Sequence, residues 1–440
     1  MPAPDLTIRK QPGCACSERH APGLRRLGIF CVFLMTSAPA DASVMPGITG
    51  RAVRVLHVTT VAKTLNFLRG QVEFMAYQGF QLYSAAGEGV GLPAHWPLPF
   101  SPVEMPRRIT PFRDLIAIYR LARIMRRVHP TIVQGHTPKA GLLTMIAAAL
   151  TRAPVRIFQV HGLPHVAARG ARRILLVLAT RVACLLADRV FCVSHSMRRI
   201  LAEENLCPPD KVFVLGNGSS GGIDTRAFDP AAHRADGLTF RQTLGIPGTA
   251  VVAGFAGRIV RDKGIGELAL AWRDLRSRFS DLHLVIAGET EAQDPIPTAA
   301  REVLENDPRV HLIGLCHEMA RYYSACDFIV LPTYREGFPN VALEAAAMGI
   351  PCVGTRVPGC TDAVVDGVTG VLVPPYDPVG LATGIAGYVA DPGLSRRHGA
   401  AARERVLREF QPDTIYLDLF RHYCDLLLSA PKVSARAPIL

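Results

Sequence analysis

The stretch AVVAGFAGRIVRDKGIGELALAWRDLRSR, residues 250–278, decides the fold. It begins with seven small or apolar residues, the composition of a strand buried on both faces. A loop from Gly257 to Gly264 follows, and a helix with apolar residues at helical spacing is expected from Ile265 to Arg278. A strand, a short loop and an amphipathic helix in this order form the unit from which parallel α/β sheets are built.

The same alternation recurs on both sides of this stretch. Further strands are predicted in the second half at 282–287, 309–313, 328–331 and 351–353. In the first half we predict strands at 53–58, 131–134, 154–160, 189–193 and 212–215, and helices at 113–128, 138–150, 170–187 and 196–204. The fold class is therefore α/β, with two Rossmann-like, doubly wound domains facing each other across a cleft.

Breaks in the alternation suggest the domain boundaries. We expect an N-terminal extension at 1–50, a first domain at 51–222, a second domain at 223–412 and a final helix within 413–430. The glycine- and serine-rich stretch 216–222 and an irregular segment up to about residue 248 would link the domains. Residues 216–221 match G-x-G-x-x-G, but no helical periodicity follows them, so a dinucleotide site is not expected.

Composition excludes several classes of protein. The 440 residues are 49% hydrophobic and 20% charged, which is typical of a packed globular chain. The uncharged, largely apolar stretch 27–40 is shorter than the roughly 20 apolar residues of a membrane-spanning helix. Eleven scattered cysteines show no metal-ligand spacing and indicate a reducing compartment.

Charge is distributed unevenly along the chain. Residues 51–224 hold 22 Lys and Arg against 9 Asp and Glu, whereas residues 225–430 hold 20 against 25. The basic first half predicts an anionic partner, such as a membrane surface or a phosphorylated substrate. Nucleic acid is not expected, because no aromatic residues alternate with the arginines to stack on bases.

The loop of residues 257–264 could bind an anion. Arg258 and Lys263 are five residues apart between a strand and a helix, so both could converge on one diphosphate with help from helix-terminal amides. The alternative is a solvated basic turn.

The stretch YREGFPNVALE, residues 334–344, carries two carboxylates on a loop and the helix after it. Gly337 and Pro339 allow a close backbone approach and a helix start, and Glu344 stands among alanines. Glu336 and Glu344 could accept hydrogen bonds from hydroxyl groups, and beside a diphosphate cradle they describe a nucleotide-sugar site. The alternative is that Glu344 is an exposed helix residue and Glu336 a cap.

Three more polar residues follow predicted strands of the first domain. His161 comes after 154–160, and His136 and Lys139 come after 131–134, so all three could meet the same cleft. The alternative for each is a structural role, which is the usual role of a lone histidine. No D-x-D motif and no His or Cys cluster with metal spacing occurs, so no metal and no cofactor are expected.

Together, these motifs resemble the retaining glycosyltransferases of family four, which have the GT-B architecture. The resemblance spans about residues 52–425. The segments 59–61, 136–141, 160–163, 216–224 and 332–344 look like the subgroup that elongates lipid-linked glycans for bacterial surface polysaccharides.

The resemblance implies roles for individual residues. Arg258 and Lys263 would hold the donor diphosphate, Glu336 the hydroxyls of the transferred sugar, and Glu344 the ribose. His161 would lie near the donor sugar. The remaining donor-binding positions would be Gly257 and the loop of Gly337, Phe338, Pro339, Asn340 and Val341, whose amides would face phosphate.

Acceptor contacts are implied less specifically. Many relatives have two adjacent glycines after the first strand, but this chain has Thr60 and Lys63 in that region. Thr60, Lys63, His136 and Lys139 are the candidate acceptor-binding residues. The family's final helix often crosses back to the first domain, and residues 413–428 are the candidate for it.

The expected function is metal-independent, retaining transfer of a hexose or N-acetylhexosamine from a nucleoside-diphosphate sugar, most simply a UDP-sugar. The acceptor would be a polyprenyl-diphosphate-linked glycan in exopolysaccharide, capsule or O-antigen synthesis. The enzyme would be cytoplasmic and peripheral on the inner membrane face, held by its basic first domain. The alternatives are a UDP-sugar 2-epimerase of GT-B type and a non-catalytic nucleotide-sugar-binding protein. The sugar, linkage, natural acceptor and oligomeric state are not encoded in these motifs.

The first 50 residues allow two interpretations. Arg25 and Arg26 precede a nine-residue apolar run, and residues 38–40 resemble a cleavage site, as in a signal peptide. Alternatively, translation starts at Met45. We favour the second interpretation, because the implied donor is a cytoplasmic metabolite.

Overall fold

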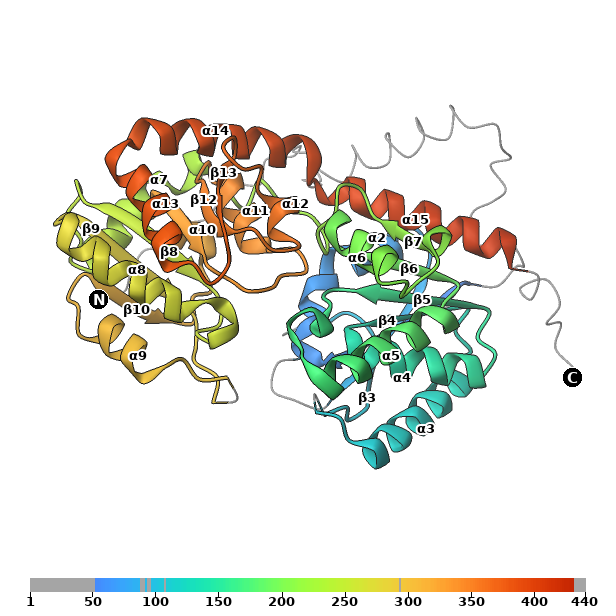
Figure 1. Cartoon of the computed structure of the whole chain (residues 1–440). Helices are drawn as coiled ribbons and strands as arrows, with labels where there is room; N and C mark the ends of the chain where they lie inside the picture. Colours follow the sequence, from blue (N-terminus) through green and yellow to red (C-terminus); the bar gives the residue numbers. More distant parts are fainter. Residues whose placement is uncertain (1–51, 88–91, 93–95, 107, 293, 431–440) are drawn as a thin grey trace, which may run out of the picture. The chain divides into compact units, whose positions relative to one another are not determined.

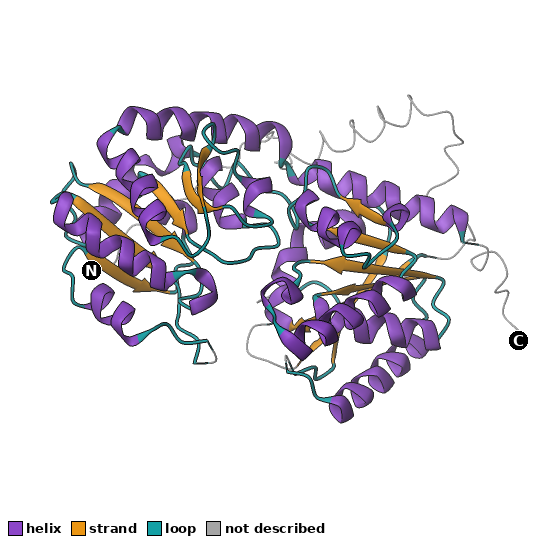
Figure 2. Ribbon diagram, in the orientation of Figure 1, coloured by secondary structure: helices purple, strands orange, loops and turns teal. Residues whose placement is uncertain are grey.

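A computed structural model describes residues 52–87, 92, 96–106, 108–292 and 294–430, which belong to one compact unit. The N-terminal extension, with both of its interpretations, lies outside these residues. The described chain forms two parallel β-sheets, each covered by helices, as Figures 1 and 2 show. The predicted fold class of two Rossmann-like domains is confirmed.

The first sheet has the order β3-β2-β1-β4-β5-β6-β7, and all of its strand pairs are parallel. Its strands are β1 (Arg54–Val61), β2 (Gln81–Gly87), β3 (Phe100–Pro102), β4 (Ile132–His136), β5 (Val155–Val160), β6 (Arg189–Cys192) and β7 (Val212–Val214).

The second sheet has the order β10-β9-β8-β11-β12-β13 and is also parallel throughout. Its strands are β8 (Val251–Ala256), β9 (Leu282–Ala287), β10 (Val310–Gly314), β11 (Phe328–Leu331), β12 (Cys352–Thr355) and β13 (Gly370–Val373).

Helices precede, connect and follow these strands. Those of the first half are α2 (Arg69–Tyr77), α3 (Pro111–Val128), α4 (Pro138–Leu150), α5 (Gly170–Leu186) and α6 (His195–Glu203). Those of the second half are α7 (Pro230–Thr243), α8 (Ile265–Arg278), α9 (Thr298–Glu305), α10 (Met319–Ser324), α11 (Asn340–Ala347), α12 (Cys360–Ala363), α13 (Pro378–Ala390) and α14 (Pro392–Glu409). The last helix is α15 (Pro412–Ser429), and short 3₁₀ turns occur at 62–68, 164–167, 209–211 and 261–263.

The prediction of an irregular linker up to about residue 248 is wrong, because helix α7 occupies much of this segment. Asp229 caps this helix by accepting a hydrogen bond from the amide of Ala231, and Pro230 is its first residue. Gly237 obscured the helical pattern, yet it lets α7 approach α10: a Cβ there would come 2.3 Å from the carbonyl oxygen of Ser324.

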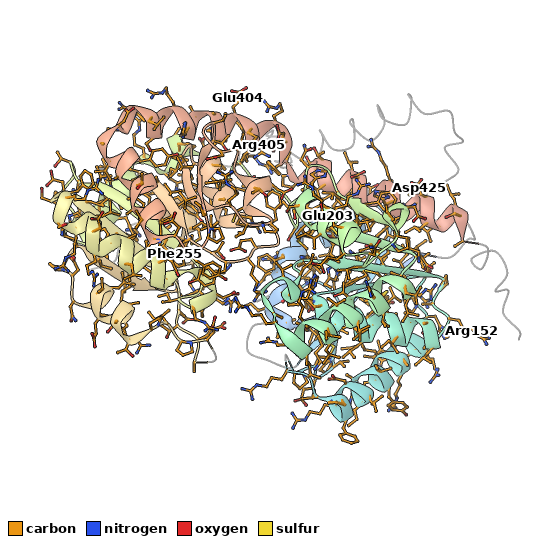
Figure 3. The ribbon with its side chains drawn as sticks, viewed as in Figure 1. Arg152, Glu203, Phe255, Glu404, Arg405 and Asp425 are labelled. Atoms are coloured by element: carbon orange, nitrogen blue, oxygen red, sulfur yellow. The ribbon has the colours of Figure 1, made fainter. Side chains whose placement is uncertain are left out.

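Apolar residues from both faces of each sheet form the core. In the second domain Phe255 on β8 has no exposed surface, and Figure 3 shows it within the densely packed side chains of that domain. In the first domain Leu56 and Val133 are equally buried. No helix of the described residues is long and apolar enough to cross a membrane.

The last helix, α15, packs against the first sheet's domain. The hydroxyl of Tyr423 donates to Oε1 of Gln134 on β4, and the ring of Tyr423 lies edge-on to Phe80. Asp418 Oδ2 accepts the amide of Gly216 at 2.9 Å. These contacts join α15 to the domain that contains the first sheet.

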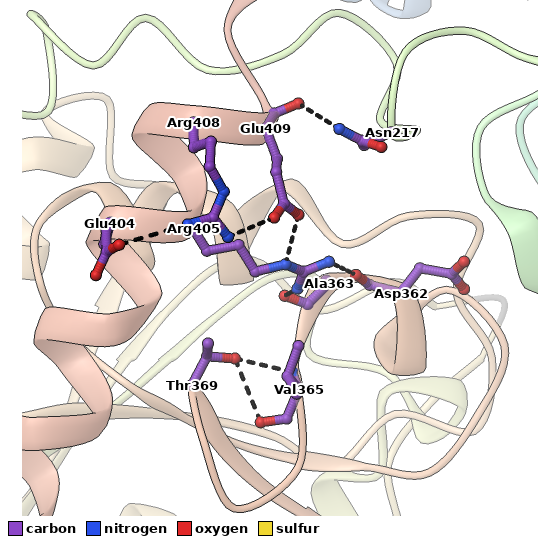
Figure 4. Close-up of polar contacts among 9 residues, drawn as sticks. All are labelled: Asn217, Asp362, Ala363, Val365, Thr369, Glu404, Arg405, Arg408 and Glu409. Atoms are coloured by element: carbon purple, nitrogen blue, oxygen red, sulfur yellow. Dashed lines mark hydrogen bonds and ion pairs between the residues drawn. The ribbon is translucent and has the colours of Figure 1, made fainter.

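Arg405 on α14 holds the loop around α12, as the close-up in Figure 4 shows. Its guanidinium donates to the carbonyl oxygens of Ala363 at 2.9 Å and Asp362 at 2.8 Å, and its Nε donates to Glu409 at 2.8 Å. Arg408 also donates to Glu409, and the Asn217 amide donates to the Glu409 carbonyl at 3.4 Å. Arg405 therefore fixes a segment that borders the candidate site.

Candidate functional site

Two loops meet where the strand order of the second sheet reverses. β8 and β11 are neighbours there, although β9, β10 and their helices separate them along the chain. The loop 257–264 follows β8, and the loop 332–339 follows β11. Ligands of open α/β sheets bind at such a reversal, beyond the carboxyl ends of the strands.

Gly264 allows the two loops to pack directly on each other. Its φ of +69° is in the left-handed region, and a Cβ there would come 1.9 Å from the carbonyl oxygen of Pro332. A larger residue would therefore separate the loops and strain the backbone.

Each candidate cation has a carboxylate partner. Lys263 Nζ forms an ion pair with Glu336 Oε1, and both side chains are largely buried, at 17% and 14% exposed. Arg258 Nη1 lies 2.8 Å from Glu291 Oε2 in a more exposed pair. The fold thus brings the positive charges of Lys263 and Arg258, and carboxylate partners from distant parts of the sequence, to one site.

A cavity of about 170 Å³ lies beside these pairs. Both halves of the chain line it: His161, Gly162, Leu163, Val166, Met197 and Ile200 come from the first, and Arg258, Asp262, Lys263, Arg335, Glu336, Gly337 and Pro358 from the second. The predicted residues Arg258, Lys263, Glu336 and His161 are therefore brought together around one space.

Backbone contacts close one side of this cavity. A Cβ on Gly337 would come 1.9 Å from the carbonyl oxygen of His161, so only glycine fits there. Ser196 Oγ accepts the amide of Gly359 at 2.8 Å, and Asp362 Oδ1 accepts the amide of Ser196 at 3.1 Å. These contacts link the two sheets' domains next to the site.

His161 is held by two polar neighbours. Its Nε2 lies 3.1 Å from His136 Nδ1, and its Nδ1 lies 3.3 Å from Ser220 Oγ. Burial lowers the pKa of His161 to about 4, so the ring is neutral near pH 7. A neutral imidazole here can donate or accept a hydrogen bond without adding charge.

The loop before α11 presents backbone more than side chains. Gly337 lines the cavity, but the Phe338 side chain is buried against Phe410, with ring centroids 5.5 Å apart. Pro339 precedes α11, and Asn340 and Val341 begin it. Any contact between Phe338 and the expected nucleotide-sugar donor would therefore be made by the Phe338 backbone.

Glu344 lies one turn into α11 and outside the cavity lining. Its Oε2 accepts a hydrogen bond from the Tyr323 hydroxyl at 2.8 Å. Burial raises the pKa of Glu344 above its ordinary value, and the Tyr323 bond opposes this shift. The alternative of an exposed Glu344 does not describe this half-buried, hydrogen-bonded carboxylate.

The four candidate acceptor-binding residues do not line this cavity. His136 is fully buried between two other histidines, which corrects the expectation that its side chain meets the cleft. Lys139 pairs with Asp114 at 2.7 Å, and Thr60 Oγ1 lies 2.6 Å from Thr137 Oγ1. Lys63 is exposed on the turn after β1.

Several residues of the site were not identified from sequence. Asp262 and Arg335 form an ion pair of 2.8 Å at the cavity wall, and both stood inside the two motifs already singled out. Glu291 and Tyr323 gave no signal, because their partners are 33 and 21 residues away. His57 could have been noticed as a polar residue within an apolar strand.

This arrangement can bind an anion bonded to a polyol. Lys263 and Arg258 offer positive charge, while Glu336 offers a hydrogen-bond acceptor within contact distance of Lys263. Within the described ranges, no group of three or more His, Cys, Asp or Glu side chains is placed to hold a metal ion.

Both halves of the chain match family models. Residues 55–220 match Glycosyltransferase Family 4, and residues 250–391 match Glycosyl transferases group 1. The capsular polysaccharide biosynthesis glycosyltransferase CapM of Staphylococcus aureus is 31% identical over 370 residues, which cover 84% of this chain and 96% of the relative.

Two further comparisons extend these matches. UDP-Gal:alpha-D-GlcNAc-diphosphoundecaprenol alpha-1,3-galactosyltransferase of Escherichia coli is 25% identical over 270 residues, covering 61% of this chain and 68% of the relative. The structure of sucrose-phosphate synthase from Thermosynechococcus elongatus superposes with a TM-score of 0.71 at 22% identity, covering 86% of this chain and 100% of that one. The latter similarity concerns the fold.

Proposed function

The chain belongs to the family 4 glycosyltransferases, and from this premise we propose that it extends a lipid-linked glycan in the synthesis of a capsular or related surface polysaccharide. The donor is a nucleoside-diphosphate sugar, most simply a UDP-sugar. The reaction retains the anomeric configuration and needs no metal ion.

The Lys263–Glu336 pair is the observation that carries this proposal. In a sugar nucleotide the transferred sugar is bonded directly to the β-phosphate, so a phosphate-binding cation and a hydroxyl-binding carboxylate must be adjacent. Lys263 and Glu336 are in direct contact on the wall of one cavity. Lys263 would stabilise the charge that develops on the diphosphate as the glycosidic bond breaks, and Arg258 would assist it.

The relatives support the choice of substrates. CapM is named for capsular polysaccharide biosynthesis, and the E. coli relative is named for a UDP-sugar donor and a diphosphoundecaprenol-linked acceptor. A polyprenyl diphosphate combines negative charge with a lipid tail, and the excess of basic residues in 51–224 complements such an acceptor.

The first domain also presents an apolar and basic surface, which we define as the α3–α5 surface. α4 lies between α3 and α5 on one side of the first sheet (Figure 1). Large apolar side chains of α3 and α5 are exposed: Phe112, Leu115, Ile116, Tyr119, Ile174, Leu175, Leu178, Val182 and Leu185. Exposed arginines accompany them, namely Arg113, Arg120, Arg123, Arg126 and Arg127 on α3 and Arg172, Arg173 and Arg181 on α5.

This combination suits the interface of an anionic bilayer, where apolar groups enter the acyl boundary and arginines meet the headgroups. Leu115 on α3 is 63% exposed, so the apolar part of this helix is wider than the stripe that faces the protein core. The proposed location is therefore the cytoplasmic face of the membrane that holds the acceptor.

The test is transfer of label from radiolabelled UDP-, GDP- and dTDP-sugars to polyprenyl-diphosphate-linked acceptors, in EDTA. The protein is used both as the full chain and starting at Met45. Label that enters the lipid phase in EDTA identifies the donor and supports metal-independent transfer. NMR of the product, read at the anomeric proton, then reports retention or inversion.

Other outcomes would contradict the proposal. Activity lost in EDTA and restored by a divalent cation would refute the metal-independent mechanism. Label that stays aqueous in a changed sugar would favour an epimerase. Binding of a sugar nucleotide without turnover on any acceptor of the panel would favour a non-catalytic binding protein.

A further inference from the structure

Three histidines form a hydrogen-bonded chain inside the first domain. His57 Nδ1 lies 3.1 Å from His136 Nε2, and His136 Nδ1 lies 3.1 Å from His161 Nε2. Successive ring centroids are 5.4 Å apart. The chain ends at Ser220, whose Oγ is 3.3 Å from His161 Nδ1.

Strand register produces this alignment. His57 on β1 is level with Gln134 on β4, two residues before His136. His136 is level with Gln159 on β5, two residues before His161. Residues two apart on a strand share a face, so the three rings form a diagonal row on one side of the sheet.

Each link requires one N–H and one lone pair. Burial lowers the pKa of His57 and His161 to about 4 and that of His136 well below its usual range, so all three rings are neutral near pH 7. A neutral ring has a single N–H. The protons must therefore all point in the same direction along the chain.

The two possible directions differ at their ends. If His161 donates through Nε2 to His136, the single proton of His57 is on Nε2, which is buried and has no hydrogen-bond partner among the described residues. If the direction is reversed, His57 buries only a lone pair there, and His161 carries its proton on Nδ1. Unpaired buried N–H groups are rare in proteins, which favours the second direction.

We infer that His57 and His136 are positioning residues that hold His161 in the Nδ1–H tautomer. Nδ1 is then the ring nitrogen available to a ligand, because Nε2 is engaged by His136. His161 lines the cavity with Lys263 and Glu336, so its N–H donates to an oxygen of the bound substrate, directly or through Ser220.

The chain orients His161 but does not deliver protons to it. A proton relay needs a group at the far end that takes up or releases a proton. His57 Nε2 has no such partner in the described part of the structure and is fully buried. The function of the row is to select one tautomer.

The direct test is ¹⁵N NMR of the full-length protein labelled at histidine, without ligand and near pH 7. Protonated and unprotonated ring nitrogens have well-separated shifts, and resonances are assigned by single His→Gln variants. We expect His161 to be protonated on Nδ1, with Nε2 as the acceptor. An Nε2–H tautomer of His161 in the wild type would overturn the inference. This measurement does not depend on enzymatic activity, so it can fail while the proposed function stands, and the reverse also holds.

Two variants add a kinetic test, which rests on the proposed function. His136→Phe removes both links and should lower kcat by roughly 10- to 100-fold, as for other losses of an orienting partner, with KM for the donor changed by less than about threefold. His136→Asn keeps a side-chain amide that can donate toward His161, and it should recover most of kcat and the Nδ1–H signal.

The second sheet offers a matched control. His283 Nδ1 lies 3.1 Å from His311 Nε2 on neighbouring strands, and neither residue lines the cavity. His283→Phe should leave kcat and the His161 spectrum unchanged. A His161 tautomer that stays the same in folded His136→Phe, or in His57→Gln if the former does not fold, would also overturn the inference.

Discussion

Lys263 and Glu336 neutralise each other at the cavity wall, so Lys263→Ala leaves a largely buried carboxylate unpaired as well as removing the phosphate-binding charge. We expect turnover to fall by ~100- to 1,000-fold, the usual loss for a preorganised charge donor. Arg258→Ala should have an effect in the same direction. Arg261→Ala on the same loop is the control, because its side chain is 72% exposed and does not line the cavity.

Steady-state kinetics with the identified donor measure these effects. Arg261→Ala should change kcat by less than about twofold, as for an exposed ion pair. A loss below about fivefold in both Lys263→Ala and Arg258→Ala would remove them from the catalytic machinery.

Glu344 links the site to pH-dependent stability. Its pKa in the folded protein is raised by burial above its unfolded value, so the folded state holds this proton to higher pH than the unfolded state does. Stability therefore falls as pH rises from the ordinary Glu pKa, about 4.3, through the raised one, and the loss persists above it. Glu344→Gln should raise Tm at pH 7 more than at pH 4.

Thermal unfolding at the two pH values checks this prediction, with Glu404→Gln as the control, since Glu404 is 78% exposed. An equal shift at pH 4 and pH 7 would contradict it. The same substitution should raise KM for the donor if Glu344 binds the ribose, because that contact exists before and during the reaction.

Single residues were predictable where they follow a strand. Arg258, Lys263, Glu336 and His161 all lie in loops that follow strands, and parallel strands bring such loops to one edge of a sheet. Glu291 and Tyr323 are defined only by contacts made after folding. The sequence correctly suggested that His136 lies at the same edge as His161, and the two rings are in contact. It did not show that the His136 side chain is buried, because the last residue of a strand can point into the core.

At the scale of elements, Arg405 anchors the end of α14 to the carbonyls of α12, and its side chain is 17% exposed. Arg405→Leu leaves those carbonyls without their charged donor. We expect a loss of about 1.5 to 3 kcal/mol in the free energy of unfolding, the usual range for hydrogen bonds to a charged group. Urea titration measures this loss.

Arg408→Leu is the matched control on the same helix. Its side chain is 61% exposed and its partners are on α14 itself, so a change below about 0.5 kcal/mol is expected. Equal losses in the two variants would show that the contacts with α12 contribute nothing beyond the helix's own stability.

Two of the elements absent from the sequence prediction have identifiable physical causes. β2 consists largely of Ala, Ser and Gly around two apolar residues, so it lacks the β-branched run that marks a strand. α7 contains Gly237, and its helical start at Asp229-Pro230 was the usable signal. Long apolar strands such as β8 and β9 were predictable because burial on both faces imposes that composition.

At the scale of the whole molecule, the α3–α5 surface predicts binding to anionic vesicles. Leu178 and Leu185 are seven residues apart on one side of α5 and are 50% and 71% exposed. Leu178→Glu with Leu185→Glu should lower the vesicle partition coefficient by at least about tenfold, because two apolar groups are lost and two negative charges face the headgroups. Raising the salt concentration should weaken wild-type binding.

Co-sedimentation with vesicles of neutral and anionic lipid measures this binding. Leu270→Glu is the control, since Leu270 is 51% exposed on α8 in the other domain. Binding that is indifferent to lipid charge and salt would contradict the proposal. Glu variants that dissociate a dimer while vesicle binding is unchanged would assign the α3–α5 surface to self-association.

The return of α15 to the first sheet has a consequence for synthesis on the ribosome. The strands of the first sheet are complete once β7 has emerged. Tyr423, the hydrogen-bond partner of Gln134, is translated about 200 residues after β7. At 5–20 residues per second this interval lasts roughly 10 to 40 s. During that time the nascent first domain has its sheet but lacks α15, the last helix that covers it. Chaperones would therefore engage the chain at this stage. A premature stop codon before α15 would leave the domain permanently without this helix.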